Sequence, residues 1–347
     1  MSLDTLLDGV NQAIAQRTPL VIQGGNSKAF LGRPTTGIVL DTRDHAGIVS
    51  YDPTELVVSV RAGTLLSELN AALDAAGQML ACEPPTFDGR ATVGGMVAAG
   101  LSGPRRPWSG SVRDFVLGTR VITGLGKHLR FGGQVMKNVA GYDLSRLLAA
   151  SFGSLGLITE VSLKVLPKPR CCASLNMAIS SDEALRKLTE WGQQSLPISG
   201  ACHDGNVLHL RLEGGEGSVA AARDRLGCSA ADATFWEDLR EQRLAFFNDP
   251  RPLWRLSLPF NIAPLDVPGT QLLDWAGAQR WLKSDSDADD IRRHAQQAGG
   301  HATCYTQGHC DLPFQPLPAA LLRYHRQLKT QLDPHGLFNP GRLYPEL

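Results

Sequence analysis

The segment with the clearest potential for chemistry lies near the N-terminus, where residues 23–28 read Gln-Gly-Gly-Asn-Ser-Lys and follow a short apolar run, Leu20 to Ile22. Two adjacent glycines after a strand allow consecutive backbone N–H groups to converge on one anion, and a neighbouring hydroxyl adds a further donor. A pyrophosphate is a suitable ligand for that arrangement. Paired glycines after a strand also form simple turns, so this segment alone leaves both interpretations open.

The same segment lacks the two common nucleotide-binding fingerprints. No G-x-G-x-x-G opens a helix after the strand, and no G-x-x-x-x-G-K-[ST] supplies a phosphate-binding lysine. The sequence therefore disfavours both an NAD-type dinucleotide fold and a P-loop NTPase.

Further glycine-containing motifs follow in order along the chain. Residues 91–98 read Ala-Thr-Val-Gly-Gly-Met-Val-Ala, residues 137–144 read Lys-Asn-Val-Ala-Gly-Tyr-Asp-Leu, and residues 153–160 read Gly-Ser-Leu-Gly-Leu-Ile-Thr-Glu. The apolar flanks of these glycines argue against a flexible linker and favour backbone that lies close to a ligand. Together with residues 23–28, the motifs resemble the flavin-binding domain of the vanillyl-alcohol oxidase and p-cresol methylhydroxylase (PCMH) superfamily.

That resemblance implies an α+β fold, in which a PCMH-type FAD-binding domain of two subdomains grips extended FAD and is followed by a smaller α+β domain. It implies that the first glycine segment meets the pyrophosphate, the Thr-Val-Gly-Gly stretch the central part of FAD, and the last motif the adenosine side. The residues concerned are Gly24, Gly25, Asn26, Ser27, Thr92, Gly94, Gly95, Gly153, Gly156 and Ile158. Some members tether FAD through a histidine at the first segment, but residues 23–28 contain neither histidine nor cysteine. We therefore expect non-covalent FAD.

Within that superfamily the chain is similar, nearly end to end, to the FAD-binding subunits of bacterial glycolate oxidases. The likeness is carried by residues 104–114, which begin Pro-Arg-Arg-Pro-Trp, by residues 211–217, and by Phe-Asn-Pro-Gly-Arg at 338–342. It implies that Asn339 and Arg342 lie near the isoalloxazine ring, where an amide or a cation stabilises the negative charge of reduced flavin. An ordinary surface position for Arg342 is the alternative.

Small helices and strands must position these motifs. The spacing of apolar residues predicts a helix from Leu3 to Ile14, strands at 38–40, 47–50 and 56–60, a helix over 65–76 that Gly77 closes, and a hairpin over 115–131. A strand over 157–165 ends at Pro-Lys-Pro, so we predict an FAD-binding domain at 1–168. The C-terminal α+β, cap-like domain would span 169–347, with helices at 181–194, 218–226 and 319–332, strands near 207–212 and 253–258, and a last segment that returns to the flavin.

Composition narrows the class of protein. The 34 basic and 34 acidic residues cancel, so no long-range attraction to nucleic acid is expected. Asp4 and Asp8 disfavour a secretory signal, and no apolar run reaches the ~18 residues of a membrane span. The seven cysteines contain no C-x-x-C and so argue against a disulfide framework and against iron–sulfur ligation. We expect a cytoplasmic protein, with peripheral contact at the inner membrane through a complex left open.

Three other groups have competing interpretations. His203 and His209 surround an Asp-Gly-Asn turn and resemble in part a metal-binding stretch of catalytic relatives, but a hairpin explains the same residues and we predict no metal site. Arg105 and Arg106 suit a carboxylate clamp, a docking contact, or solvated loop cations. Asp143 suits a helix cap, while the role of the lysine at position 137 stays open.

The resemblance implies an FAD subunit of a glycolate oxidase or dehydrogenase complex, which oxidises glycolate, a small 2-hydroxy acid, to glyoxylate. Its expected partners are a larger homologous FAD subunit and an iron–sulfur subunit that takes the electrons. Such a reaction needs a general base, and no catalytic residue is identified from the sequence. A non-catalytic assembly or relay subunit of the same complex is the alternative, and a stand-alone NADPH-dependent flavin reductase of the UDP-N-acetylenolpyruvoylglucosamine type is a third.

Overall fold

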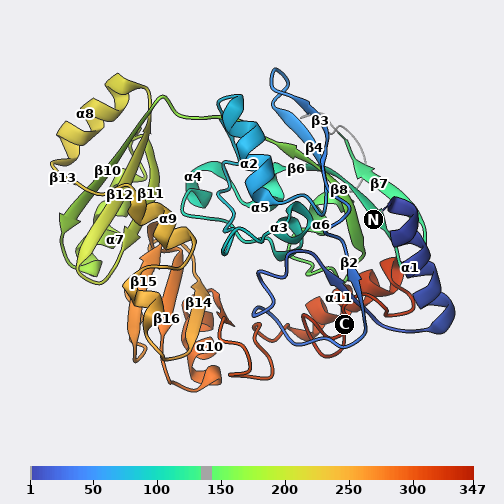
Figure 1. Cartoon of the computed structure of the whole chain (residues 1–347). Helices are drawn as coiled ribbons and strands as arrows, with labels where there is room; N and C mark the ends of the chain where they lie inside the picture. The colour runs from blue at the N-terminus through green and yellow to red at the C-terminus, as the bar shows by residue number, and fades with distance from the viewer. Residues whose placement is uncertain (1, 134–142) are drawn as a thin grey trace. The chain divides into compact units, whose positions relative to one another are not determined.

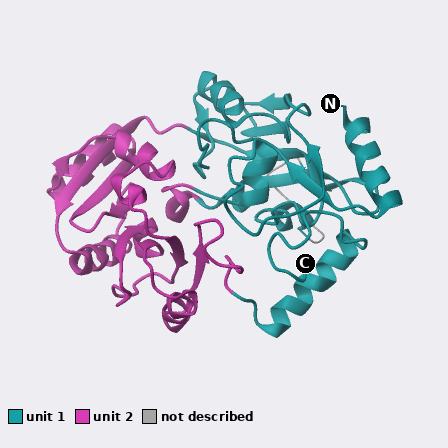
Figure 2. Cartoon of the chain, turned by 60° about the horizontal axis from the view of Figure 1, so that its bottom comes forward, with its two compact units in different colours: residues 1–102, 110–167, 316–347 teal, residues 103–109, 168–315 magenta. Residues whose placement is uncertain are grey.

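A computed structural model describes residues 2–133 and 143–347. The chain divides into two compact units, which Figure 2 draws in different colours. Unit 1 comprises residues 1–102, 110–167 and 316–347, and unit 2 comprises residues 103–109 and 168–315. The two ends of the chain therefore belong to the same unit. Most of the motif at 137–144 lies outside the described residues.

Unit 1 begins with helix α1 (Leu3–Gln16), whose apolar side chains recur at helical spacing so that Leu6, Val10 and Ala13 are buried. The Ser2 hydroxyl caps this helix by accepting a hydrogen bond from the Thr5 N–H. Strand β1 (Leu20–Gln23) then pairs in parallel with β2 (Ile38–Asp41). The paired glycines follow β1 directly, as the sequence predicts.

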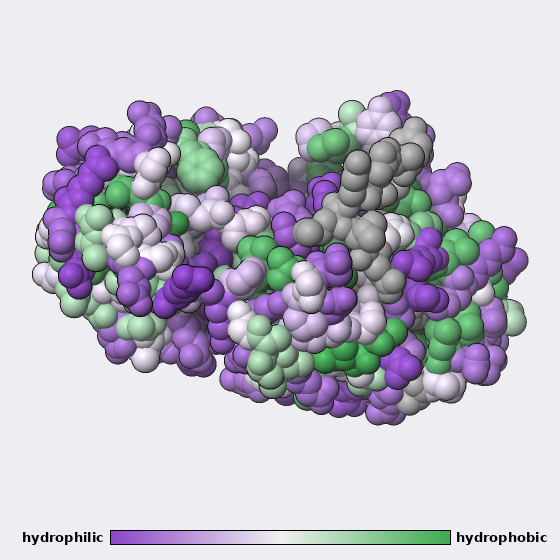
Figure 3. Space-filling model, turned by 90° about the horizontal axis from the view of Figure 1, so that it is seen from above, coloured by the Kyte–Doolittle hydropathy of each residue, from purple (hydrophilic) through white to green (hydrophobic). Residues whose placement is uncertain are grey.

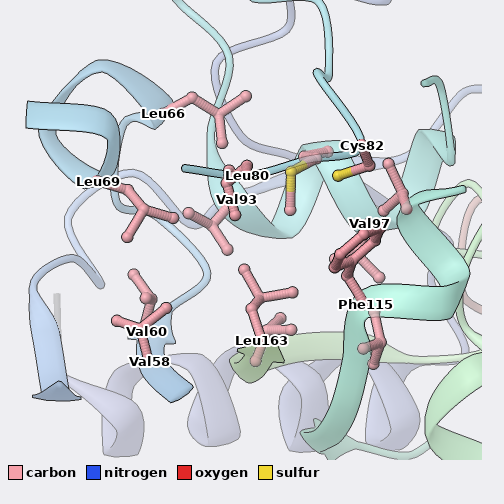
Figure 4. Close-up of a cluster of buried hydrophobic side chains, with 14 of the residues drawn as sticks. Val58, Val60, Leu66, Leu69, Leu80, Cys82, Val93, Val97, Phe115 and Leu163 are labelled. Carbon is pink, nitrogen blue, oxygen red and sulfur yellow. The ribbon is translucent and has the colours of Figure 1, made fainter. Parts of the chain in front are cut away.

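The main sheet of unit 1 is antiparallel, with strand order β3-β4-β8-β6-β7 (Figure 1). Its strands are β3 (Ile48–Asp52), β4 (Val57–Arg61), β6 (Val116–Ile122), β7 (His128–Gly132) and β8 (Leu157–Lys164). Helices α2 (Leu66–Ala75), α3 (Val93–Ala99) and α5 (Val112–Phe115) contribute apolar side chains to the core on this sheet. Figure 4 shows Val60, Leu69 and Leu163 of that core turned toward one another. The predicted hairpin at 115–131 is confirmed as β6 and β7.

The C-terminal segment completes unit 1. Helix α11 (Ala319–Leu332) has the bounds that the sequence predicts, and after it Phe338 forms a parallel bridge with Leu20 of β1. Leu337 and Phe338 join α1 and β1 in a second apolar core. The remaining elements of the unit are β5 (Gln78–Met79), paired with β9 (Leu166–Pro167), and α6 (Leu144–Leu147).

Unit 2 is built on one eight-stranded antiparallel sheet, with strand order β13-β10-β12-β11-β15-β16-β14-β17. Its first half contains β10 (Cys171–Ala178), α7 (Ser181–Trp191), β11 (Ile198–His203), β12 (Val207–Gly214), α8 (Glu216–Leu226) and β13 (Ser229–Ala230). The second half contains β14 (Leu253–Ser257), β15 (Thr270–Asp274), η2 (Trp275–Gly277), β16 (Gln279–Lys283), α10 (Ala288–Gln297) and β17 (His301–Cys304). Between the halves lie α9 (Thr234–Arg240) and η1 (Ala245–Asn248), and the inserted segment 103–109 supplies α4 (Arg106–Ser109).

The two halves of unit 2 repeat one topology. Numbered within its own half, each set of strands stands in the order fourth, first, third, second, as β13-β10-β12-β11 and β17-β14-β16-β15. This is the split β-α-β-β-α-β arrangement, except that the described loop 258–269 contains no helix where the second half would have its first one. The halves join through β11 and β15, where His203 pairs with Leu273.

The surface is mixed in character. Figure 3 shows hydrophilic and apolar side chains interspersed over the face in view. Exposed apolar residues include Ile38 and Val39 on β2 and Ile48 and Val49 on β3. Within residues 2–133 and 143–347, every helix is too short or too polar to cross a bilayer.

Candidate functional site

Two adjoining cavities in unit 1 share much of their lining, namely Ile22, Gly24, Gly95, Ala98, Phe152 and Asn339. One contains ≈ 660 Å³ of unfilled space and extends along Gly25 to Ala29 and Arg342. The other contains ≈ 400 Å³ and extends along Thr42, Gly94, Gly153 and Ile158. Because their linings overlap, we describe them as one site, the glycine groove.

The paired glycines are needed for close packing at one wall of this groove. A Cβ atom at Gly25 would overlap the carbonyl oxygen of Arg90, and a Cβ atom at Gly24 would overlap the Thr92 hydroxyl. Asn26, which follows, has φ 54°, in the left-handed region that asparagine tolerates better than most residues. Only glycine at 24 and 25 therefore lets this turn lie against residues 90–92.

The same turn presents backbone donors. None of the N–H groups from Gly24 to Ser27 donates a hydrogen bond to another described residue. Four consecutive donors of this kind, beside the Ser27 hydroxyl, form a concave set that suits an anion. This geometry favours the pyrophosphate interpretation of residues 23–28 over a simple turn.

The second motif contributes to the groove in another way. Thr92 caps α3 by accepting a hydrogen bond from the Gly95 N–H at 3.3 Å, and the Gly94 N–H donates to the Ala62 carbonyl at 2.8 Å. A Cβ atom on Gly94 would lie 2.7 Å from that of Ala62. These backbone donors are thus already satisfied, so Gly94 and Gly95 line the groove through their small size.

Asn339 joins three parts of the groove. Its Oδ1 atom accepts a hydrogen bond from the Ile22 N–H at 2.8 Å, and its Nδ2 atom donates to the Phe152 carbonyl at 2.6 Å. A Cβ atom on Gly153 would lie 2.7 Å from that Nδ2 atom. Asn339 is only 6% exposed, so its amide fixes the walls of the groove.

Arg342 lies in the groove lining and is not a free surface charge. Its guanidinium donates to the carbonyl oxygens of Arg33 at 2.9 Å, Ala29 at 3.1 Å and Lys28 at 3.4 Å. Burial lowers the pKa of Arg342. The arginine therefore holds the loop that follows the glycine turn, and the alternative of an ordinary surface position is wrong.

In the last motif, residues 153–160, some residues line the groove and others pack in the core. Gly153 and Ile158 line the groove, whereas Gly156 packs against Val121, whose Cγ1 atom would lie 2.6 Å from an added Cβ. Phe152 and Lys28 also line the groove, and the sequence analysis did not select either of them. Lys28 is the last residue of the glycine segment 23–28, and this position in the sequence could have indicated that it lines the groove.

A hairpin explains His203 and His209 of unit 2. Residues 204–206 connect β11 to β12, His203 Nε2 lies 2.9 Å from the Ile179 carbonyl, and His209 Nε2 lies 3.0 Å from Asp204. Burial opposes ionisation of Asp204, but hydrogen bonds from His209 and two backbone N–H groups outweigh it and lower its pKa. Asp143 also has the expected role, because it accepts a hydrogen bond from the Arg146 N–H at the start of α6.

Arg105 has an internal partner. This residue is 9% exposed, and its guanidinium pairs with Glu213, with Nη2 to Oε1 at 2.7 Å. Burial raises the pKa of Glu213, but Arg211 and Arg105 outweigh that effect and hold it below its ordinary value. Arg106 lies 4.4 Å from the ring centroid of Trp275. The interpretation of Arg105 as a solvated loop cation is therefore wrong.

Known proteins share both the sequence and the fold. A family model described as an FAD binding domain matches residues 2–132. The glycolate oxidase subunit GlcE of Escherichia coli is 63% identical over 342 residues, which cover 99% of this chain and 97% of that protein. The glycolate oxidase subunit GlcD of Bacillus subtilis is 33% identical over 155 residues, which cover 44% of this chain and 33% of that protein.

Among solved structures, an alkyldihydroxyacetonephosphate synthase covers 98% of this chain with a TM-score of 0.68 at 16% identity, and 74% of that protein is matched. This likeness shows the fold alone. Fold and groove together define the class of flavoproteins with an FAD-binding domain. The chain belongs, within that class, to the family of FAD-binding glycolate oxidase subunits that includes GlcE of Escherichia coli. The family and fold class that the sequence predicts are thereby confirmed.

Proposed function

We propose that this chain is the FAD-binding subunit of a glycolate oxidase complex and that it holds FAD non-covalently in the glycine groove. The observation that supports the site most strongly is the set of backbone N–H groups from Gly24 to Ser27, which donate to no described residue. The two glycines of this turn also pack closely against residues 90–92. FAD, when bound, supplies the electron-accepting chemistry that oxidation of a 2-hydroxy acid requires. The whole set Gly24, Gly25, Asn26, Ser27, Thr92, Gly94, Gly95, Gly153, Ile158, Asn339 and Arg342 is proposed to surround it.

The lining of the groove supports non-covalent binding. Among the described residues that line it there is no histidine, cysteine or tyrosine side chain that could form a bond to the flavin. In this proposal the cofactor is retained by burial and hydrogen bonds alone.

The proposed complex contains two further subunits. The GlcE and GlcD relatives are both named as subunits of glycolate oxidase, and we propose that a GlcD-like flavin subunit assembles with this chain. We propose further that an iron–sulfur subunit receives the electrons and that the chain works in the cytoplasm, with any contact at the inner membrane made through the complex.

One observation favours a second role, that of a flavin relay or assembly subunit. The ionisable side chains among the described lining residues are Lys28 and Arg342, and no carboxylate or imidazole is present among those residues to act as a general base. In this version the GlcD-like subunit oxidises glycolate, and this chain passes electrons on or stabilises the assembly.

Single-turnover reduction separates the two roles. The purified chain, loaded with FAD, is mixed anaerobically with glycolate, and the flavin absorbance is compared with that of the assembled complex. Bleaching of the isolated chain would show that it oxidises glycolate itself. Bleaching of this chain's flavin only within the complex would support the relay, and a complex that glycolate cannot bleach would contradict the proposed function.

A further inference from the structure

Lys28 is a buried cation in the glycine groove. The inference drawn from it rests on the proposed function, in which this groove binds FAD. The residue is 9% exposed and lines the groove beside the four N–H groups of the glycine turn. Its ammonium donates a hydrogen bond to the Ser27 hydroxyl at 3.2 Å and lies 5.2 Å from the ring centroid of Phe87. The ammonium is thus held at the same wall as the backbone donors.

The backbone at Phe87 has a strained conformation, which the surrounding structure must impose. Its φ is 42°, and Asp88 and Gly89 follow with φ 62° and 74°. A bulky residue in the left-handed region is strained and persists only where its surroundings impose that conformation. The Phe87 ring also meets Phe30 edge-on, with 5.6 Å between centroids. This loop ends at Arg90, whose carbonyl packs on Gly25, so one segment fixes both the ring and the glycine turn.

The charges of the groove favour an anionic ligand at this wall. Its two cations are Lys28 and Arg342, and no acidic side chain is among its described lining residues. Arg342 gives its guanidinium N–H groups to loop carbonyls. An ammonium carries three donors on a flexible stem and binds phosphate as a point charge.

We propose that Lys28 is a pyrophosphate-binding residue of the FAD site and that Phe87 is a positioning residue, whose ring holds the ammonium beside the glycine turn. Lys28 then adds a charge-assisted contact to the neutral contacts of the backbone N–H groups. Because that contact is ionic, it also makes FAD binding depend on salt concentration.

The test compares the affinity of the full chain for FAD across variants and salt concentrations. Lys28→Met should weaken FAD binding by about 10–100-fold, as expected for losing a charge-assisted hydrogen bond, and should flatten the dependence of Kd on NaCl. Lys28→Arg keeps the charge and should retain the salt dependence. Lys127→Met removes a lysine that is exposed and outside the groove, and it should change neither quantity.

Phe87→Leu keeps apolar bulk but removes the ring face, and it should weaken FAD binding by about 3–10-fold. If Phe87 acts through Lys28, the double variant should bind no more weakly than Lys28→Met alone. An unchanged FAD affinity in Lys28→Met, or a lower affinity with the wild-type salt dependence, would overturn the inference. A wild-type chain that binds no FAD would instead contradict the proposed function, so the two failures are distinguishable.

Discussion

At the scale of single residues, the glycines of the first motif allow close packing because they lack a Cβ atom. Replacing Gly25 by alanine puts a Cβ atom onto the Arg90 carbonyl, so the turn must move away from residues 90–92 and its N–H groups lose their alignment. We expect Gly25→Ala to weaken FAD binding by more than about tenfold, or ~1.4 kcal/mol, in a fluorescence titration. Gly217→Ala is the matched control, because an added Cβ there meets open space in helix α8. Equal affinities for the two variants would contradict the packing argument.

Because two histidines in unit 1 have lowered pKa values, we predict that the chain loses stability in mild acid. Burial, followed by the Arg61 charge, lowers the pKa of His45, and burial with the Arg120 charge lowers that of His128, both from 6.5. The unfolded chain then binds protons more tightly than the native chain. The contribution of these histidines to the free energy of unfolding is therefore fully present above about pH 6.5, and it is lost as the pH drops toward their lowered pKa values in the native state. The urea midpoint should therefore decrease between pH 7 and 5.

The variant His128→Gln tests this linkage. The Thr159 hydroxyl donates to the Arg120 carbonyl at 3.1 Å and therefore accepts from His128 Nε2 at 2.9 Å, a donor that the glutamine amide can replace. We expect the variant to lose less stability over the same pH interval than the wild-type chain. A steeper decline in the variant would contradict the assignment.

Some residue roles were predictable and others were not. The paired glycines after an apolar strand were enough to locate the turn that we propose binds the pyrophosphate, although this segment alone left a simple turn open. The roles of Asn339 and Arg342 depend on backbone groups of Ile22, Phe152 and Arg33, which lie more than 180 positions away. A single sequence contains no information on such pairings, so it predicted proximity to the flavin but not the hydrogen bonds.

At the scale of elements, a buried ion pair attaches helix α11 to the groove. The Lys329 ammonium donates to the Ser154 carbonyl at 2.7 Å, the Asp333 carboxylate at 2.7 Å and the Phe338 carbonyl at 2.8 Å. Asp333 in turn accepts from the Leu337 and Phe338 N–H groups. The pair thus connects residues next to Gly153 and Asn339, both of which line the groove.

Removing one member of this pair should be costly. Lys329→Met leaves Asp333, which is 1% exposed, as a buried charge without its cation, and breaking such a pair costs about 3–5 kcal/mol. We expect the free energy of unfolding to fall by that amount in urea titrations. The double variant Lys329→Met with Asp333→Asn removes both charges and should recover part of the loss. A single variant as stable as the wild type would contradict this account of the C-terminal segment.

The sequence predicted elements well where apolar spacing was regular and poorly where buried strands carry polar residues. Helix α1 and strands β8 and β12 follow their apolar periodicity closely. Helix α11 has the predicted bounds, although it buries Lys329 and leaves Leu321 and Tyr324 exposed. Strand β16 is buried throughout but contains Gln279, Arg280 and Lys283, so no alternation marks it. Arg280 is 0% exposed because its guanidinium donates to carbonyls of the loop 258–269, including Ala263 at 2.8 Å. Such residues satisfy their polar groups through tertiary contacts that local patterns do not reveal.

At the scale of the whole molecule, the fold class followed from the motifs, whereas the arrangement of the chain did not. The topology repeated in the two halves of unit 2 was not visible as a repeat in the sequence, because different residues can form the same strand order. The insertion of residues 103–109 into unit 2 depends on Arg105, Glu213 and the Trp275 indole, which donates to the Gly103 carbonyl at 3.0 Å. These are contacts between segments that are far apart in the sequence.

The most direct test of the account is to load the purified full-length chain with FAD, record its visible spectrum, and then precipitate the protein with heat or acid. We predict flavin bands on the intact chain and release of the chromophore into the supernatant as FAD, with loading abolished or strongly reduced in Gly25→Ala. A chain that takes up no FAD, or a flavin that stays with the precipitate, would contradict a non-covalent FAD site in the glycine groove.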